Sequence, residues 1–195
     1  MCGRYSLEAD IFALLEFYRL QEAQLEFHGQ GEIFPTNPVP VFTGTGGLTS
    51  MDWGFLTSFS KRPLINARGE TVHEKPTFRR AFQVSRCLLP ASSFFEWRSE
   101  EGKKKKTKLE ISLVDRNLFS MAGIYMTTQT NGRESFHCCI ITTQANEQMQ
   151  SIHDRMPVIL PKSAEIEYLT GMSGLPGLQR LLQPSEEELR FRICD

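Results

Sequence analysis

The chain has 195 residues, 40% of them hydrophobic and 23% charged, and its formal net charge is −1 at pH 7. This composition is typical of a single globular domain, expected over residues 1–195, and the balanced charge excludes a strongly basic DNA-binding domain. No apolar run is long enough to cross a bilayer and no secretion signal opens the chain, so we expect a cytoplasmic protein without membrane contact.

The five cysteines form no C-x-x-C pair, and Cys138 and Cys139 are adjacent. This pattern favours neither a disulfide framework nor a zinc ribbon. We therefore expect reduced thiols, no metal and no cofactor. Nothing in the sequence resembles an assembly interface, which favours a monomer.

The first expected element is a helix. Ser6 is a plausible N-cap, and apolar side chains repeat at helical spacing from Ile11 to Tyr18. Two apolar runs, 39–43 and 48–53, then flank a glycine-rich turn, which predicts a β-hairpin.

The rest of the chain alternates many short strands with few helices. Further strands are expected at 63–66, 86–89, 94–98, 108–114, 118–125 and 136–143, and helices at 75–83, 146–152, 163–169 and after Pro176. This order predicts an α+β fold with an antiparallel, barrel-like sheet flanked by helices. We interpret the charged run at 100–106, which includes four successive lysines, as a solvated hairpin tip rather than a DNA-binding finger.

Cys2 directly follows Met1, so removal of Met1 would leave a free α-amine and a thiol on neighbouring carbons of one residue. Further along, an apolar strand runs into Asn66 and Arg68, which are alternate residues on one face. The Asn66 amide could hold a reacting group, and the Arg68 guanidinium could bind a phosphate. The alternative is a turn cap and a surface ion pair.

Two further segments offer groups for proton transfer. Glu96 lies among large aromatic residues, and partial burial there is expected to raise its pKa; the alternative is a strand glutamate that faces water. His153 carries an imidazole suited to proton transfer near neutrality. Asp154 could fix its tautomer, and Arg155 could bind an anion.

Taken together and in this order, six segments resemble the SRAP family, the SOS response-associated peptidases that include abasic-site shield proteins. The segments are MCGRYS at the start, WG at 53–54, INARGET at 65–71 with its continuation to 78, RCLLP at 86–90, FFEW at 94–97 and IHDRMP at 152–157. The resemblance implies the family's α+β fold, with a barrel-like sheet and a positively lined groove for single-stranded DNA.

The resemblance also implies the residues of the active site, which are matched to this chain motif by motif. The catalytic residues would be Cys2, Asn66, Glu96 and His153, and the DNA contacts would be Arg4, Trp53, Arg68, Trp97 and Arg155. Core packing remains the alternative for both tryptophans. Many members of the family have an asparagine in the segment 31–35, where this chain has Glu32.

The implied partner is single-stranded DNA with abasic sites, met at damaged DNA in the nucleoid. After loss of Met1, the α-amine of Cys2 would attack the open-chain aldehyde, and the thiol would close a thiazolidine ring, giving a DNA–protein crosslink. His153 would assist sugar opening, Glu96 proton transfers at the Schiff base, and Asn66 would hold the amine. Self-cleavage of Met1 and lyase activity are also implied.

Three other functions stay open from the residues. An N-terminal-nucleophile amidohydrolase would also expose a cysteine after Met1. A thiol peptidase could be built from Cys2 and His153 and would turn over peptides without DNA. A non-covalent single-stranded-DNA-binding module would not need Cys2.

Overall fold

The computed structural model describes most of the chain. The described residues are 2–23, 25, 27, 31–44, 47–100, 102, 105–130 and 132–194. The expectations for Met1, for the centre of the turn at 45–46 and for residues 101, 103 and 104 of the charged run concern residues outside these ranges.

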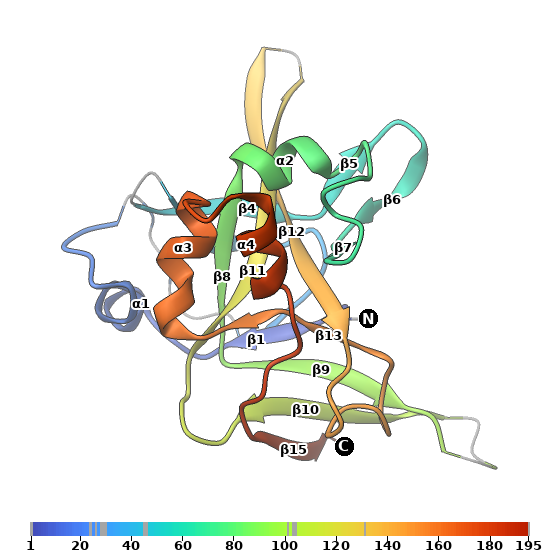
Figure 1. Cartoon of the computed structure of the whole chain (residues 1–195). Helices are drawn as coiled ribbons and strands as arrows, with labels where there is room; N and C mark the ends of the chain where they lie inside the picture. Colours follow the sequence, from blue (N-terminus) through green and yellow to red (C-terminus); the bar gives the residue numbers. More distant parts are fainter. Residues whose placement is uncertain are drawn as a thin grey trace.

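Five strands form a closed barrel (Figure 1). They are β3 (Pro38–Thr43), β4 (Gly47–Trp53), β8 (Arg86–Ala91), β11 (Phe119–Thr130) and β12 (Arg133–Gln144). β3 pairs with β4 and β8, β11 pairs with β8 and β12, and β12 closes the ring on β4. The expected α+β fold with a barrel-like sheet is confirmed. The closing pair is parallel, whereas the other four are antiparallel.

Short strands extend the barrel on either side of β12. β7 (Asn66–Arg68) pairs with β12 in parallel, and β13 (Arg155–Pro157) pairs with it in the antiparallel sense. β14 (Ile159–Leu160) pairs with β11, and β5 (Phe55–Thr57) and β6 (Ser60–Leu64) form a separate hairpin.

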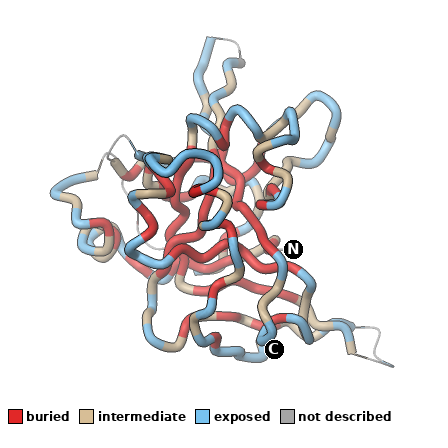
Figure 2. Tube along the Cα trace, in the orientation of Figure 1, coloured by how far each residue is buried: buried red, intermediate tan, exposed pale blue. Residues whose placement is uncertain are grey.

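A second, antiparallel sheet has the strand order β15-β10-β9-β1-β2. Its strands are β1 (Tyr5–Leu7), β2 (Gly31–Ile33), β9 (Ser93–Arg98), β10 (Thr107–Leu113) and β15 (Leu189–Cys194). β9 follows β8 after a bend at Ser92, so one run of chain passes from the barrel into this sheet. Figure 2 shows buried chain in the barrel and along β1 and β9.

The helices lie around the barrel. They are α1 (Ile11–Tyr18), α2 (Arg79–Val84), α3 (Glu165–Thr170), which follows a 3₁₀ turn (Lys162–Ala164), and α4 (Gly174–Leu181). Arg86 of β8 donates hydrogen bonds to the carbonyls of Tyr168 (2.6 Å) and Leu169 (3.2 Å), which holds α3 against the barrel. None of the helices in the described part of the chain has the length and apolar character needed to span a membrane.

The N-cap expected at Ser6 is wrong. The Asp10 carboxylate accepts the N–H of Ala13 at 2.9 Å and caps α1, whereas Ser6 lies in β1 and its hydroxyl bonds to that of Ser93 at 2.7 Å. Pairing with β2 and β9 satisfies the backbone of residues 5–7, so the helix starts only after this strand.

The helix expected at 146–152 is also wrong, since the chain there forms successive turns. Asn146 accepts the N–H of Met149 at 3.0 Å and donates to the carbonyl of Ser185 at 2.9 Å. The N–H of Ala145 bonds to the carbonyl of Asp154 at 3.0 Å, because β12 and β13 pair directly beyond this loop. A closed loop of this length leaves no room for a longer helix.

Two helix boundaries differ from the expectations. The segment 71–78 forms turns, so α2 begins only at Arg79. α4 begins at Gly174, before Pro176, because proline is tolerated in the first turn of a helix, where its missing N–H would have no intrahelical partner.

Candidate active site

Cys2 lies just before β1 and is completely buried. Asn66, the first residue of β7, donates a hydrogen bond from Nδ2 to the carbonyl of Cys2 at 2.9 Å. The amide oxygen of Asn66 is buried and accepts no hydrogen bond from any described residue. The pairing of β7 with β12 therefore brings a free acceptor to the start of the chain.

Glu96 of β9 is buried beside the same end of the chain, with 3% of its surface exposed. Tyr5 pairs with Phe94, and the N–H of Phe95 bonds to the carbonyl of Arg4 at 2.9 Å, so the strand register continues toward Cys2 and Glu96. Burial, and then the charge of Glu96, raise the pKa of the Cys2 thiol far above its usual range. The thiol is therefore protonated at neutral pH.

His153 lies near the end of the loop between β12 and β13. Its Nδ1 accepts the N–H of Arg155 at 2.9 Å and lies 2.7 Å from a carboxylate oxygen of Asp154. A neutral ring accepts the first bond, and a protonated ring donates to the aspartate, so the imidazole has a partner in either state. β7 and β13 meet at Thr142 of β12, which places His153 at the same end of β12 as the end of β7.

Arg68 of the segment INARGET and Arg155 of the segment IHDRMP have different surroundings. Arg155 is buried, donates to both carboxylate oxygens of Glu70 at 2.6 and 2.9 Å, and donates to the carbonyl of Thr142 at 2.8 Å. These bonds from Arg155 hold the pKa of Glu70 below its usual range. Arg68 is exposed and forms no hydrogen bond or ion pair with any described residue. Arg68 is thus available to an anion, whereas Arg155 holds the fold together.

The two candidate tryptophans also differ. Trp53 is fully buried, packs edge-on against Tyr5 with ring centroids 5.2 Å apart, and donates from Nε1 to the carbonyl of Ile65 at 3.0 Å. This arrangement favours core packing, because neither face of the Trp53 ring is accessible to a base. Trp97 is half-buried, and its ring centre lies 5.9 Å from the guanidinium of Arg4.

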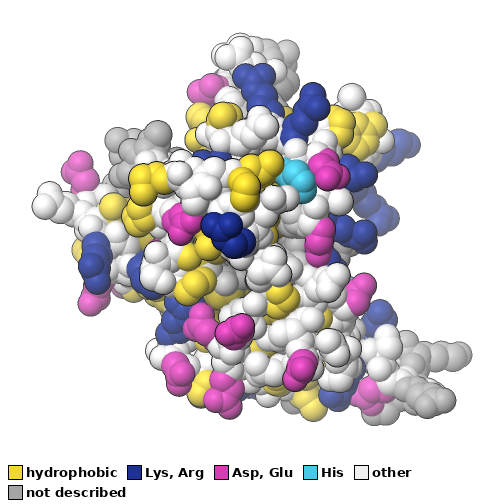
Figure 3. All heavy atoms as spheres, viewed as in Figure 1, with side chains coloured by type: hydrophobic (Ala, Val, Ile, Leu, Met, Phe, Trp, Pro, Cys, Tyr) yellow, Lys and Arg dark blue, Asp and Glu magenta, His cyan; other side chains and the backbone are white. Residues whose placement is uncertain are grey.

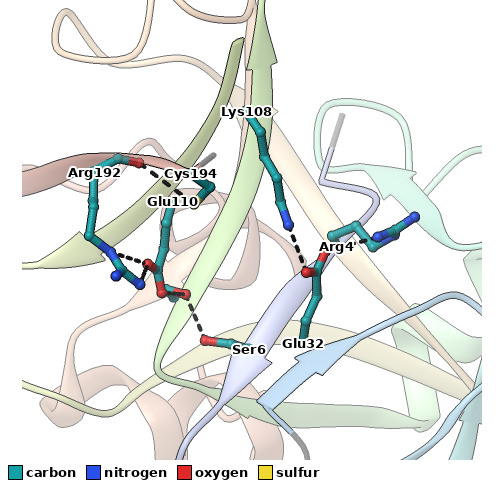
Figure 4. Close-up of polar contacts among 8 residues, drawn as sticks. Arg4, Ser6, Glu32, Lys108, Glu110, Arg192 and Cys194 are labelled. Carbon is teal, nitrogen blue, oxygen red and sulfur yellow. Dashed lines mark hydrogen bonds and ion pairs between the residues drawn. The ribbon is translucent and has the colours of Figure 1, made fainter. Parts of the chain in front are cut away.

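Arg4 contacts a carboxylate next to the site. Its guanidinium lies 2.8 Å from one oxygen of Glu32, and Lys108 lies 2.6 Å from the other (Figure 4). Although partial burial opposes the shift, the hydrogen bonds from Lys108 and Arg4 lower the pKa of Glu32. Glu32 thus neutralises part of the charge around Arg4.

Sequence reasoning missed most of a basic edge formed by exposed side chains on β6, β7 and α2. The basic edge consists of Lys61, Arg62, Arg68, Arg79 and Arg80. In Figure 3, lysine and arginine side chains gather along the right-hand edge of the molecule. Residues 61–80 contain six basic and two acidic residues, a local net charge of +4, in a chain whose net charge is −1. Counting charge over short windows would have found this segment.

Comparison with known proteins identifies the family. A family model described as SOS response associated peptidase (SRAP) matches residues 1–194. The abasic site processing protein YoqW of Bacillus subtilis is 36% identical over 200 residues, which cover 96% of this chain and 89% of YoqW. The abasic site processing protein YedK of Escherichia coli is 30% identical over 178 residues, covering 87% of this chain and 79% of YedK.

A crystal structure of a Bacteroides thetaiotaomicron protein has the same fold. Its TM-score is 0.89 at 25% sequence identity, and the match covers 100% of this chain and 92% of that one. The motifs, the fold and the family model agree, and the chain belongs to the SOS response associated peptidase (SRAP) family.

Proposed function

We propose that this protein processes abasic sites in single-stranded DNA by forming a covalent thiazolidine crosslink through Cys2, once Met1 has been removed. The observation that carries this proposal is the placement of Cys2, buried beside Glu96 and hydrogen-bonded through its carbonyl to Asn66 at 2.9 Å. The names of the relatives YoqW and YedK, both abasic site processing proteins, support the substrate.

The raised pKa of the thiol sets the order of bond formation. An α-amine, with a reference pKa of about 7.7–8.0, supplies a neutral nucleophile near pH 7, whereas the buried thiol keeps its proton. The amine nitrogen attacks the aldehyde carbon of the opened sugar, and water leaves to give the imine. The S–H then adds across C=N, so that sulfur bonds to carbon and the proton goes to nitrogen. One water is lost overall.

Three side chains assist these steps. Asn66 holds the backbone of Cys2, and its amide oxygen is available to accept a hydrogen bond from the α-amine. Glu96 transfers protons at the Schiff base, and His153 does so during sugar opening, where general acid–base groups typically contribute about 10²–10⁴-fold. Removal of Met1 by self-cleavage and a slow Schiff-base lyase reaction belong to the same proposal.

The DNA strand follows the basic edge toward Cys2. Arg68 is exposed, forms no hydrogen bond or ion pair with any described residue, and suits a phosphate contact. Phe59, at the turn of the β5–β6 hairpin, is 72% exposed beside Lys61 and Arg62. An exposed aromatic ring among cations is typical of sites that stack single-stranded bases. Trp97, which is half-buried, offers a second surface near Arg4.

The structure gives less support to a thiol peptidase. Such an enzyme attacks its substrate with a thiolate, usually formed by an adjacent imidazolium. Burial and the nearby charge of Glu96 both oppose ionisation of Cys2. An amine nucleophile needs no thiolate, so the same surroundings are compatible with the crosslinking reaction.

The proposal is tested by mixing protein lacking Met1 with an abasic single-stranded oligonucleotide and heating the product on a denaturing gel. The wild type is expected to give a heat-resistant band. Cys2→Ala is expected to lose that band and to keep only a Schiff base that borohydride traps, because it retains an α-amine but no thiol. Intact mass confirms the loss of Met1.

Cys194→Ala is the matched control, since Cys194 is partly exposed and lies in β15. It is expected to crosslink like the wild type. A heat-resistant band from Cys2→Ala, or from protein shown to retain Met1, would contradict the proposal.

A further inference from the structure

We propose that Arg4 and Lys108 form a phosphate-binding site beside Cys2, and that Glu32 occupies this site as an internal anion until a DNA phosphodiester displaces it. This inference rests on the proposed function, because it assigns where the backbone of the bound strand is held.

The site is built from three parts of the second sheet. Arg4 immediately precedes β1, Glu32 lies in β2, and Lys108 lies in β10. β9 and β1 separate β10 from β2, so the side chains of Lys108 and Glu32 meet over these two strands. Figure 4 shows Arg4 and Lys108 meeting at the Glu32 carboxylate. Arg4 donates to one carboxylate oxygen at 2.8 Å and Lys108 to the other at 2.6 Å.

Aromatic rings hold both cations in place. The guanidinium of Arg4 lies 3.6 Å from the centre of the Phe34 ring, and the ammonium of Lys108 lies 4.3 Å from that of Phe95. These cation–π contacts involve the side chains of the cations and not the carboxylate. Arg4 and Lys108 are therefore directed toward one point by contacts that persist when the anion at that point is exchanged.

A phosphodiester fits the point that Glu32 fills. Like a carboxylate, it presents two anionic oxygens, which a guanidinium and an ammonium can bind together. The position is next to the reacting residue, because the thiol of Cys2 donates to the carbonyl of Arg4 at 3.7 Å. Lys108 pairs with Trp97, the neighbour of Glu96.

Solvent exposure makes the exchange feasible. The exposed fractions of the side chains of Arg4, Glu32 and Lys108 are 31%, 27% and 25%. Ion pairs reached by water contribute little to stability, so replacing one anion by another costs little. The Arg155–Glu70 pair differs, since the Arg155 side chain is only 9% exposed. Because the pKa of Glu32 is lowered, Glu32 stays ionised near neutrality and competes with DNA throughout that range.

Glu32→Gln tests the competition. Binding of undamaged oligothymidylate to protein lacking Met1 is measured by fluorescence anisotropy between 50 and 200 mM salt. We expect the variant to bind more tightly and to show a salt slope steeper by about 0.7 for each phosphate gained. The gain in affinity should then shrink about threefold over this fourfold rise in salt. Adding Lys108→Gln should remove the gain.

Glu187→Gln is the control for net charge, because Glu187 pairs with Arg116 and not with Arg4 or Lys108. It should bind DNA like the wild type. Thermal melting checks that each variant is folded, and Glu32→Asn serves as a second neutral variant.

The crosslinking assay separates the two ideas. Equal or weaker binding by both Glu32 variants, with normal wild-type crosslinking, would overturn the phosphate site and leave the proposed function intact. Tighter, salt-sensitive binding by the variants without any wild-type crosslink would support the phosphate site and contradict the proposed function.

Discussion

The segments 66–68 and 153–155 both place an arginine two residues after a polar candidate, yet their arginines differ in role. Both segments adjoin β12, where Thr142 pairs with Arg68 on one side and with Pro157 on the other. Arg68 is exposed and forms no hydrogen bond or ion pair with any described residue, whereas Arg155 is enclosed by Glu70 and Thr142.

This contrast shows that the role of an arginine in a sequence motif depends on the partner that the fold places beside it. With a carboxylate or carbonyl partner it stabilises the fold, and without one it can bind a ligand. Glu70 lies two residues after Arg68, yet it reaches Arg155 from across β12. Glu70 thus bonds to Arg155, whereas Arg68 acts on Glu70 only through its charge and donates no hydrogen bond to any described residue. The variants below test each side of this difference.

The largest effect is expected at His153. His153→Ala should slow crosslinking to abasic DNA by about 100-fold, because the imidazole proposed to transfer protons during sugar opening is lost. Single-turnover rates measure the loss. His73→Ala is the matched control, since His73 contacts Glu74 and Gln179 instead. Equal rates for the two variants would remove His153 from the mechanism.

The next effect concerns stability. Arg155→Gln should lower the free energy of unfolding by about 2 kcal/mol, because charged hydrogen bonds to Glu70 and Thr142 are lost. Urea denaturation measures it. Arg155→Lys keeps the charge without the bidentate geometry and should lie between the wild type and Arg155→Gln. An unchanged free energy of unfolding would contradict the structural role of Arg155.

Arg155→Gln should also change how the free energy of unfolding depends on pH. Since the pKa of Glu70 is lowered in the folded state, its contribution is present above the ordinary glutamate pKa of about 4.3 and is lost as the pH falls through the folded value. Arg155→Gln removes the largest cause of the lowered pKa of Glu70. The free energy of unfolding of Arg155→Gln should therefore fall less steeply than that of the wild type as the pH is lowered below about 5.

The smallest effect is expected at Arg68. Arg68→Gln should weaken binding of undamaged single-stranded DNA about threefold and reduce the salt slope by about 0.7, because one phosphate contact is lost. Its free energy of unfolding should change by less than about 0.5 kcal/mol, as for other exposed positions. Arg180→Gln, at an exposed position of α4, removes the same charge elsewhere. Equal affinities for both variants would show that Arg68 is not a DNA contact.

Much of the fold could be predicted because its long strands carry regular apolar patterns. The hairpin of β3 and β4 and the strands β8, β9 and β10 were predicted within a few residues. β1, β2 and β13 have only three residues each and are set by pairing with distant strands, which local patterns cannot show. The helix expected at 146–152 failed for a related reason, since pairing of β12 with β13 closes that loop.

The site was predictable in its residues more than in its geometry. The motifs named Cys2 and Asn66, but the hydrogen bond between them depends on the parallel pairing of β7 with β12. The contact of Glu32 with Arg4 and Lys108 joins β2 and β10 to the residue just before β1, and it leaves no local sequence signal. The partners of charged groups are set by tertiary structure. The sequence therefore identified the arginines but not which of them form hydrogen bonds within the protein.

The most direct test of the central claim is the mass of the crosslinked N-terminal peptide. Protein lacking Met1 is reacted with abasic single-stranded DNA, digested with protease and nuclease, and measured by tandem mass spectrometry. The account predicts a fragment that begins at Cys2 and carries the sugar with loss of one water, with both the nitrogen and the sulfur of Cys2 blocked. A sugar adduct on any other residue, or a free thiol on Cys2 in the heat-stable product, would contradict it.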